Sequence, residues 1–224
     1  MILAITGSKG GASKSTLAIN IAAELHRRRC RVLLVDADPQ GTASTWVAVA
    51  AEQQRPAPTL VAMGATMAQA DQLPRLAAGF DHIIIDGPPR LGEVQRAMML
   101  VATCALLPCV PSTRDVWAMS EALELVKEAR ARVRPDLVAA VMLVRTQPRA
   151  SITRLSRAAL QACGLPVLAA ELGQRVAFPQ ALAAGLGVTE FDPEGRAAEE
   201  TRALVDELLS LSPPRRSRRK NGAT

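Results

Sequence analysis

The stretch "GSKGGASKST", residues 7–16, directly follows the apolar run "ILAI" at 2–5. An apolar strand, a glycine-bearing turn and a helix form an anion site, because backbone N–H groups converge there and the helix N-terminus adds positive potential. Lys14 supplies a cation for phosphate groups, and Ser15 supplies a hydroxyl for Mg²⁺. The usual phosphate-loop pattern has glycines where this sequence has Ser8 and Ser13. The loop alone therefore indicates a phosphate site without establishing one.

Apolar runs alternate with helical patterns along the rest of the chain. We expect strands at 2–6, 31–36, 59–63, 82–86, 105–110, 138–144 and 166–169, and helices at 15–28, 66–77, 116–132, 152–163 and 197–211. Most of the strands are continuously apolar, as strands buried on both faces of a parallel sheet are. The sequence therefore predicts a doubly wound α/β domain, with a mostly parallel sheet flanked by helices. We expect one domain over 1–212, ended by Pro213 and Pro214.

The charge of the chain lies mostly in its last twelve residues. The formal net charge is +6, but the segment "PPRRSRRKNGAT" at 213–224 holds five basic residues and no acidic one. The remainder carries 22 basic and 21 acidic residues. The folded body is therefore nearly neutral, and the net charge does not establish a nucleic-acid partner. We expect the basic tail to be disordered.

Composition narrows the class of protein further. Nearly half of the 224 residues are apolar, which excludes a disordered chain. Tyrosine is absent and only five residues are aromatic, which disfavours a single-strand binder that stacks bases on aromatic side chains. The four cysteines form no CxxC pair, and no apolar run is long enough to span a membrane. We expect a soluble, intracellular protein whose cysteines are small core residues.

Acidic residues follow two further strands of the predicted sheet. "VLLVDADPQG" places Asp36 and Asp38 after the second strand, and "HIIIDGPP" places Asp86 after the fourth. Ligands of such sheets bind beyond the carboxyl ends of the strands. An acid in that cleft is stabilised by a nearby cation or a bound metal. A single Asp would be a helix cap or a turn residue, but three acids beside a lysine loop predict a nucleotide–Mg²⁺ site.

These motifs together resemble the ParA/MinD family of deviant Walker ATPases. The resemblance covers approximately residues 1–210 and is closest to the small ParA-type partition ATPases. Its parts are "KGGASKST" at 9–16, "VDADPQGTASTW" at 35–46, "IIIDGPP" at 83–89, "PCVPSTRDVWAMSEAL" at 108–123 and the block at 164–190.

The resemblance implies a role for each matching residue. Lys14 would bind phosphate and Lys9 would reach the ATP of a partner subunit across a homodimer. Asp38 would position the attacking water, while Ser15, Asp36 and Asp86 would serve Mg²⁺. The nucleotide would contact the loop residues Lys9, Gly10, Gly11, Ala12, Ser13, Lys14, Ser15 and Thr16.

Two positions depart from the family pattern. Ser13 replaces the glycine that commonly precedes the phosphate lysine, and a serine is suited to that position only if its φ is not positive. The family often has an Asn-Arg pair near the end of the sixth strand, where adenine is read. Here "LVRTQPR" has Val144 at the Asn position. Base selectivity is therefore less firmly implied than phosphate binding.

The resemblance also implies a partition cycle in the cytoplasm. An ATP-bound homodimer would coat nucleoid DNA without sequence preference, and a ParB-like or adaptor protein on the cargo would stimulate slow hydrolysis. The cargo would be a plasmid, a chromosome origin or a protein assembly. For the DNA surface we select a basic cluster, against the alternative of an ordinary solvated face: Arg149, Arg154, Arg157 and Arg175.

Three alternatives belong to other classes. A MinD-like regulator recruited to membranes would need an amphipathic C-terminal helix, but "ETRALVDELLSL" is acidic on its polar side and is typical of a packing helix. An iron–sulfur reductase of the nitrogenase iron-protein kind would need bridging cysteines in contexts that Cys104 and Cys109 do not reproduce. A structural dimer without hydrolysis requires that Asp38 or Lys14 does not act.

Overall fold

The apolar runs of the sequence form the strands of one sheet. The computed structural model describes residues 1–7, 11, 13–90 and 92–211. The strands are β1 (Ile2–Ile5), β2 (Val32–Asp36), β3 (Thr59–Ala62), β4 (His82–Asp86), β5 (Cys104–Cys109), β6 (Val138–Thr146) and β7 (Leu172–Gly173). Their order is β3-β2-β4-β1-β5-β6-β7, and all adjacent pairs are parallel. The expected doubly wound α/β fold is confirmed, with every strand pair parallel.

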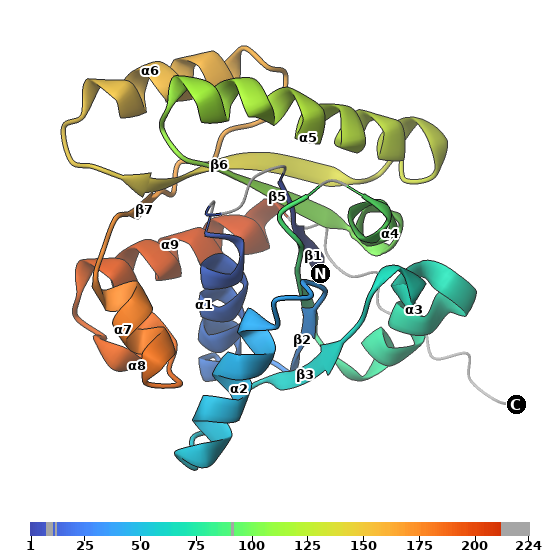
Figure 1. Ribbon diagram of the computed structural model, residues 1–224, viewed down its shortest axis with the longest axis vertical. Coiled ribbons are helices and arrows are strands. Elements are labelled where there is room, and N and C mark those ends of the chain that lie inside the picture. Colours follow the sequence, from blue (N-terminus) through green and yellow to red (C-terminus); the bar gives the residue numbers. More distant parts are fainter. Residues whose placement is uncertain (8–10, 12, 91, 212–224) are drawn as a thin grey trace, which may run out of the picture.

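Helices cover both faces of this sheet (Figure 1). The helices are α1 (Lys14–Arg27), α2 (Thr42–Glu52), α3 (Gln72–Leu76), α4 (Glu93–Val101), α5 (Thr113–Arg132), α6 (Ser151–Gln161), α7 (Ala177–Ala183), α8 (Val188–Phe191) and α9 (Arg196–Leu211), with short 3₁₀ turns at Ala65–Asp71 and Ala77–Gly79. One apolar core lies under α1, α2, α7, α8 and α9, and the other lies under α3, α4, α5 and α6. The continuously apolar strands are therefore buried on both sides, as a parallel sheet requires.

The register of the central strands places the acidic residues beside the phosphate loop. Asp36 of β2 pairs with Asp86 of β4, and Ile5 of β1 pairs with Asp86 on the other side. Because β1 leads into the loop at 7–13, the ends of β2, β4 and β1 bring two carboxylates and this loop to one edge. The sequence predicted a binding site beyond the ends of the first, second and fourth strands, and the parallel order of the strands puts these ends at one edge.

Two expected elements differ in the structure. The strand expected at 166–169 is only an isolated bridge between Val141 and Val167. After it, the Glu207 carboxylate of α9 accepts hydrogen bonds from the Ala169 and Ala170 backbone N–H groups, both at 2.8 Å, in place of a neighbouring strand. The helix expected at 66–77 is divided into 3₁₀ and α segments, because Pro74 cannot donate the backbone hydrogen bond that a continuous helix needs.

Four helices were not expected from the sequence: α2, α4, α7 and α8. Their apolar patterns are short, and α7 and α8 have only seven and four residues. The signal for α2 was present, because Ala43, Trp46 and Ala50 recur at helical spacing and all three are buried. Cys104 and Cys109 are buried as expected, whereas Cys30 and Cys163 are only partly buried.

Candidate functional site

The phosphate loop ends in a residue with left-handed backbone. Ser13 has φ 59° and ψ 24°, and α1 begins at the next residue. The condition stated for a serine at this position is therefore not met, since φ is positive. The Ser13 side chain forms no capping hydrogen bond with α1. A bound anion could accept hydrogen bonds from the N–H groups in the first turn of this helix.

The phosphate loop is described only in part. Lys9, Gly10 and Ala12 lie outside the described residues, so their roles stay predictions. Gly11 is described and has φ 80°, a conformation that glycine adopts without strain.

Lys14 is buried at the start of α1, with 6 % of its surface exposed. Burial lowers the pKa of the Lys14 ammonium, while the nearby charges of Asp86 and Asp38 act in the opposite direction. The charges of Asp86 and Asp38 therefore favour the protonated form of Lys14, and the role of Lys14 in binding phosphate stays a prediction.

Asp86 is fully buried at the end of β4. Burial raises its pKa to about 7. The Ser15 hydroxyl opposes this effect, and the charges of Asp36 and Asp38 add to it. Neither carboxylate oxygen makes a hydrogen bond of normal geometry with a described residue. Such orphaned buried oxygens fit Mg²⁺, which prefers carboxylate, hydroxyl and water oxygens. Ser15 and Asp86 could therefore hold the metal that the sequence predicts.

Asp36 and Asp38 take different positions after β2. Asp36 Oδ2 accepts hydrogen bonds from Ser44 Oγ at 2.6 Å and Ser44 N at 2.8 Å, and Asp36 Oδ1 accepts one from Asp38 N at 3.3 Å. Asp38 Oδ1 accepts a hydrogen bond from Gln40 N at 3.0 Å. Asp36 thus fixes the start of α2 and the backbone of Asp38. It can support the metal side by positioning its neighbours.

Gln95 of α4 is a positioning residue that sequence reasoning missed. Its side chain is fully buried, and Gln95 Oε1 accepts a hydrogen bond from Thr6 Oγ1 at 2.5 Å. Gln95 Nε2 donates to Gly7 O at 3.2 Å and Pro88 O at 2.6 Å. It therefore ties the start of the phosphate loop to the loop after Asp86. The signal in the sequence is weak: Gln95 and Arg96 are the two polar residues of the otherwise apolar stretch "VQRAMML".

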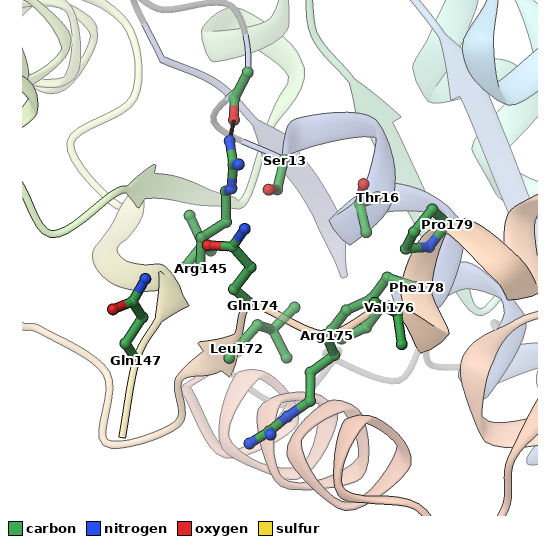
Figure 2. A pocket seen from close by; sticks show the side chains of 13 residues that line it. Ser13, Thr16, Arg145, Gln147, Leu172, Gln174, Arg175, Val176, Phe178 and Pro179 are labelled. Carbon is green, nitrogen blue, oxygen red and sulfur yellow. Dashed lines mark hydrogen bonds between the residues drawn. The ribbon is translucent and has the colours of Figure 1, made fainter. Parts of the chain in front are cut away.

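A pocket of about 670 Å³ opens beside the phosphate loop. Figure 2 shows side chains from four places in its lining: Ser13 and Thr16 from the phosphate loop and α1, Arg145 and Gln147 from the end of β6, Leu172 from β7 with Gln174, Arg175 and Val176 after it, and Phe178 and Pro179 from α7. Arg145 Nη1 donates a hydrogen bond to Gly11 O at 3.4 Å. A nucleotide whose phosphates lay on the loop could place its base and sugar in this pocket.

The four predicted DNA-binding arginines fall into two groups. Arg157 pairs with Glu171 at 2.5 Å and donates to Leu168 O, and Arg175 pairs with Glu200 of α9 at 2.6 Å. Arg149 and Arg154 have no ion pair with any described residue. All four line a pocket of about 380 Å³. Their role in DNA binding stays a prediction. Because Arg157 and Arg175 are already paired with carboxylates, Arg149 and Arg154 are the stronger candidates.

Known proteins resemble this chain over nearly its whole length. The family model "CobQ/CobB/MinD/ParA nucleotide binding domain" matches residues 3–188. "Maintenance of carboxysome distribution protein A" of Halothiobacillus neapolitanus is 33 % identical over 210 residues, covering 92 % of this chain and 95 % of that protein. "Chromosome-partitioning ATPase Soj" of Thermus thermophilus is 27 % identical over 93 % of this chain and 95 % of that protein.

Solved structures share the fold. The Cyanothece McdA(D38A)–ATP complex is 19 % identical and has a TM-score of 0.75, covering 95 % of this chain and 97 % of that chain. The Mg-ADP complex of the septum site-determining protein MinD from Pyrococcus horikoshii is 18 % identical and has a TM-score of 0.72, covering 92 % and 95 %.

In the described part of the chain, no helix is long and apolar enough to cross a membrane. The all-parallel sheet, the lysine loop and the carboxylates at one edge agree with the matches in sequence and in structure. The chain is a ParA/MinD-type ATPase and belongs to the CobQ/CobB/MinD/ParA nucleotide-binding domain family.

Proposed function

We propose that this chain hydrolyses ATP in a Mg²⁺-dependent reaction, that ATP joins two copies into a homodimer, and that the dimer positions a cargo on DNA. The observation that carries the proposal is the position of two buried charged residues at one edge of the sheet: Lys14 at the start of α1 and Asp86 at the end of β4, beside Asp36. A phosphate–metal site needs, before its ligand arrives, a buried cation near a buried carboxylate such as Asp86, whose oxygens accept no hydrogen bond of normal geometry from a described residue.

In this proposal each side chain serves the transfer of the γ-phosphoryl group to water. Lys14 and the N–H groups at the start of α1 bind the phosphates, and Thr16 adds a contact. Asp38 accepts a hydrogen bond from the attacking water and orients it. Ser15 and Asp86 hold Mg²⁺, which when bound neutralises phosphate charge. Asp36 fixes the loop that carries Asp38.

Lys9 links hydrolysis to dimerisation in this proposal. The phosphate loop already has its own lysine, so a second cation is best explained by the partner subunit's ATP. A cation supplied in trans stabilises the charge of the transferring group and makes hydrolysis conditional on dimerisation. Only four of the 27 basic residues are lysines, and two of these lie in the loop. The compact ammonium group is thus used where close approach to phosphate matters.

Turnover of ATP with Mg²⁺ tests this assignment. We expect Lys14→Ala to lose nucleotide binding, and Lys9→Ala to retain part of the binding but to lose hydrolysis that DNA or a partner stimulates. A chain with Lys127→Ala serves as a matched control, because Lys127 lies on the exposed surface of α5 and pairs with Glu124. Normal stimulated turnover of the Lys9→Ala protein would reject the role of Lys9 in the dimer.

The cargo is proposed from the relatives. Proteins at 33 % and 31 % identity are both named for the maintenance of carboxysome distribution, and Soj is named for chromosome partitioning. We therefore favour a protein assembly as cargo, carried by a ParB-like or adaptor partner that stimulates hydrolysis. In the ATP-bound state the dimer would associate with nucleoid DNA in the cytoplasm.

DNA binding is assigned mainly to Arg149 and Arg154. We expect the double change of Arg149 and Arg154 to Ala to weaken binding equally across sequences and to reduce the magnitude of the negative slope of log K against log[salt] by about 2. In a gel-shift or anisotropy titration, Arg132→Ala is the control, because this exposed arginine lies at the C-terminal end of α5 and does not line the pocket of the four predicted arginines. An unchanged salt slope in the double variant would reject this surface.

A further inference from the structure

The pocket beside the phosphate loop has a phosphate end and an apolar end. Gly11, Ser13 and Thr16 line the first, and the second is formed mainly by Leu172, Val176, Phe178 and Pro179. Its volume of about 670 Å³ is within the usual range for small-molecule sites. A nucleoside triphosphate with its phosphates on the loop would therefore place its base between apolar side chains. These hold any base without reading its edge.

Val144 cannot read the edge of a base. It has no polar side-chain atom, and its side chain is fully buried in the core under α1 and α9. The residues that could replace this function are the polar ones on the pocket wall. These are Arg145, Gln147, Gln174 and Arg175.

Only one of these four is well placed for a base. Arg145 donates to Gly11 O, and Arg175 pairs with Glu200. Figure 2 shows the carboxamide of Gln174 pointing into the pocket, whereas Gln147 lies on the side away from Thr16. The Gln174 backbone is fixed, because its N–H donates to Thr146 O at 3.0 Å. Its carboxamide makes no hydrogen bond with another described residue, so it is available to a ligand.

We propose that Gln174 reads the purine base and that the site accepts both ATP and GTP. This rests on the proposed nucleotide-binding function. A carboxamide both donates and accepts, so it can accept from the adenine 6-amino group or, turned over, donate to the guanine 6-oxo group. Gln174 is an exposed residue with several rotatable bonds, so neither orientation is imposed by packing. Discrimination between the two purines is then weak.

Displacement of a fluorescent ATP analogue by unlabelled ATP, GTP and CTP, all with Mg²⁺, tests the proposal. We expect ATP and GTP to compete within about tenfold of each other, and CTP to compete more weakly. Gln174→Leu should weaken both purine nucleotides by about tenfold. Gln147→Leu is the matched change, because Gln147 lies on the side of the pocket away from Thr16, and it should leave both within about twofold.

A second variant tests whether the Gln174 carboxamide binds the two purines in opposite orientations. Gln174→Glu leaves an acceptor without a donor, which suits adenine and opposes guanine. Added negative charge weakens both triphosphates alike, so the ratio of the two affinities is the readout. We expect this ratio to move toward ATP by about tenfold.

Preference for ATP over GTP by more than about a hundredfold in the unchanged protein would overturn the proposal. So would equal effects of Gln174→Leu and Gln147→Leu, or an unchanged ratio in Gln174→Glu. Failure of the proposed function itself gives a different result. In that case no triphosphate displaces the probe, and Lys14→Ala changes nothing.

Discussion

At the scale of single residues, two residues at the sheet edge beside the phosphate loop have an energetically unfavourable conformation or environment. Ser13 has a left-handed backbone, which glycine adopts more easily, and Asp86 is a buried carboxyl whose oxygens accept no hydrogen bond of normal geometry from the described part of the chain. The pKa of Asp86 rises to about 7 because burial disfavours its charged form. Both unfavourable features lie where a ligand would compensate them. A phosphate accepts hydrogen bonds from backbone N–H groups, and Mg²⁺ is coordinated by carboxylate oxygens. This pattern is expected of a binding site rather than of a structural turn.

Ser13→Gly tests the first of these costs. Glycine removes the strain of φ 59°, so we expect the free energy of unfolding to rise by about 1 kcal/mol. Ser13→Ala keeps the Cβ atom and serves as the control, with no gain expected. Chemical denaturation of the nucleotide-free proteins measures the difference. Equal stability of the glycine and alanine variants would show that the left-handed backbone is not the source of strain.

At the scale of elements, α2 and α7 are held together by a close backbone approach. Gly185 follows α7 with φ 64°, and a Cβ atom there would lie 2.7 Å from Ala50 N of α2. The Trp46 indole N–H of α2 also donates to Leu186 O at 3.2 Å. The end of α7 therefore anchors α2, which follows directly after Asp36 and Asp38.

Gly185→Ala should be strongly destabilising because clash and strain add. Gly164→Ala is the matched control, because Gly164 has φ 84° but nothing within 4 Å of its Cβ position. We expect the control to lose about 1 kcal/mol from the unfavourable φ, and Gly185→Ala to lose about 3 kcal/mol or more. Thermal or urea unfolding gives both values. Similar losses of unfolding free energy in the two variants would show that α2 moves away from the added Cβ atom without an energetic penalty.

The elements that the sequence predicted correctly are those with long and regular patterns. Continuous apolar runs such as "VLLVD" and "HIIID" marked β2 and β4, and helical spacing marked α1, α5, α6 and α9. The failures depend on tertiary partners. Glu207 of α9 satisfies the backbone after Val167, and no local pattern could indicate that. The missed α7 and α8 are too short to show a period.

At the scale of the whole molecule, the sheet order explains how distant motifs form one site. β4 lies between β2 and β1, so the phosphate loop, Asp36 and Asp86 lie at one edge, although about 80 residues of chain separate the loop from Asp86. The motifs predicted this edge because parallel strands end together. They did not predict Gln95, which bridges Gly7 and Pro88 from α4, or the ion pairs of Arg157 and Arg175. Those contacts depend on packing between elements.

Sedimentation velocity of the Asp38→Ala protein tests most directly whether ATP joins two copies of this chain. In the proposed function Asp38 orients the attacking water, so its removal should let ATP persist and the dimer accumulate. We expect a dimer with ATP and Mg²⁺, a monomer without nucleotide, and a monomer when Lys14→Ala is added. A protein that remains monomeric with ATP and Mg²⁺ would contradict the account.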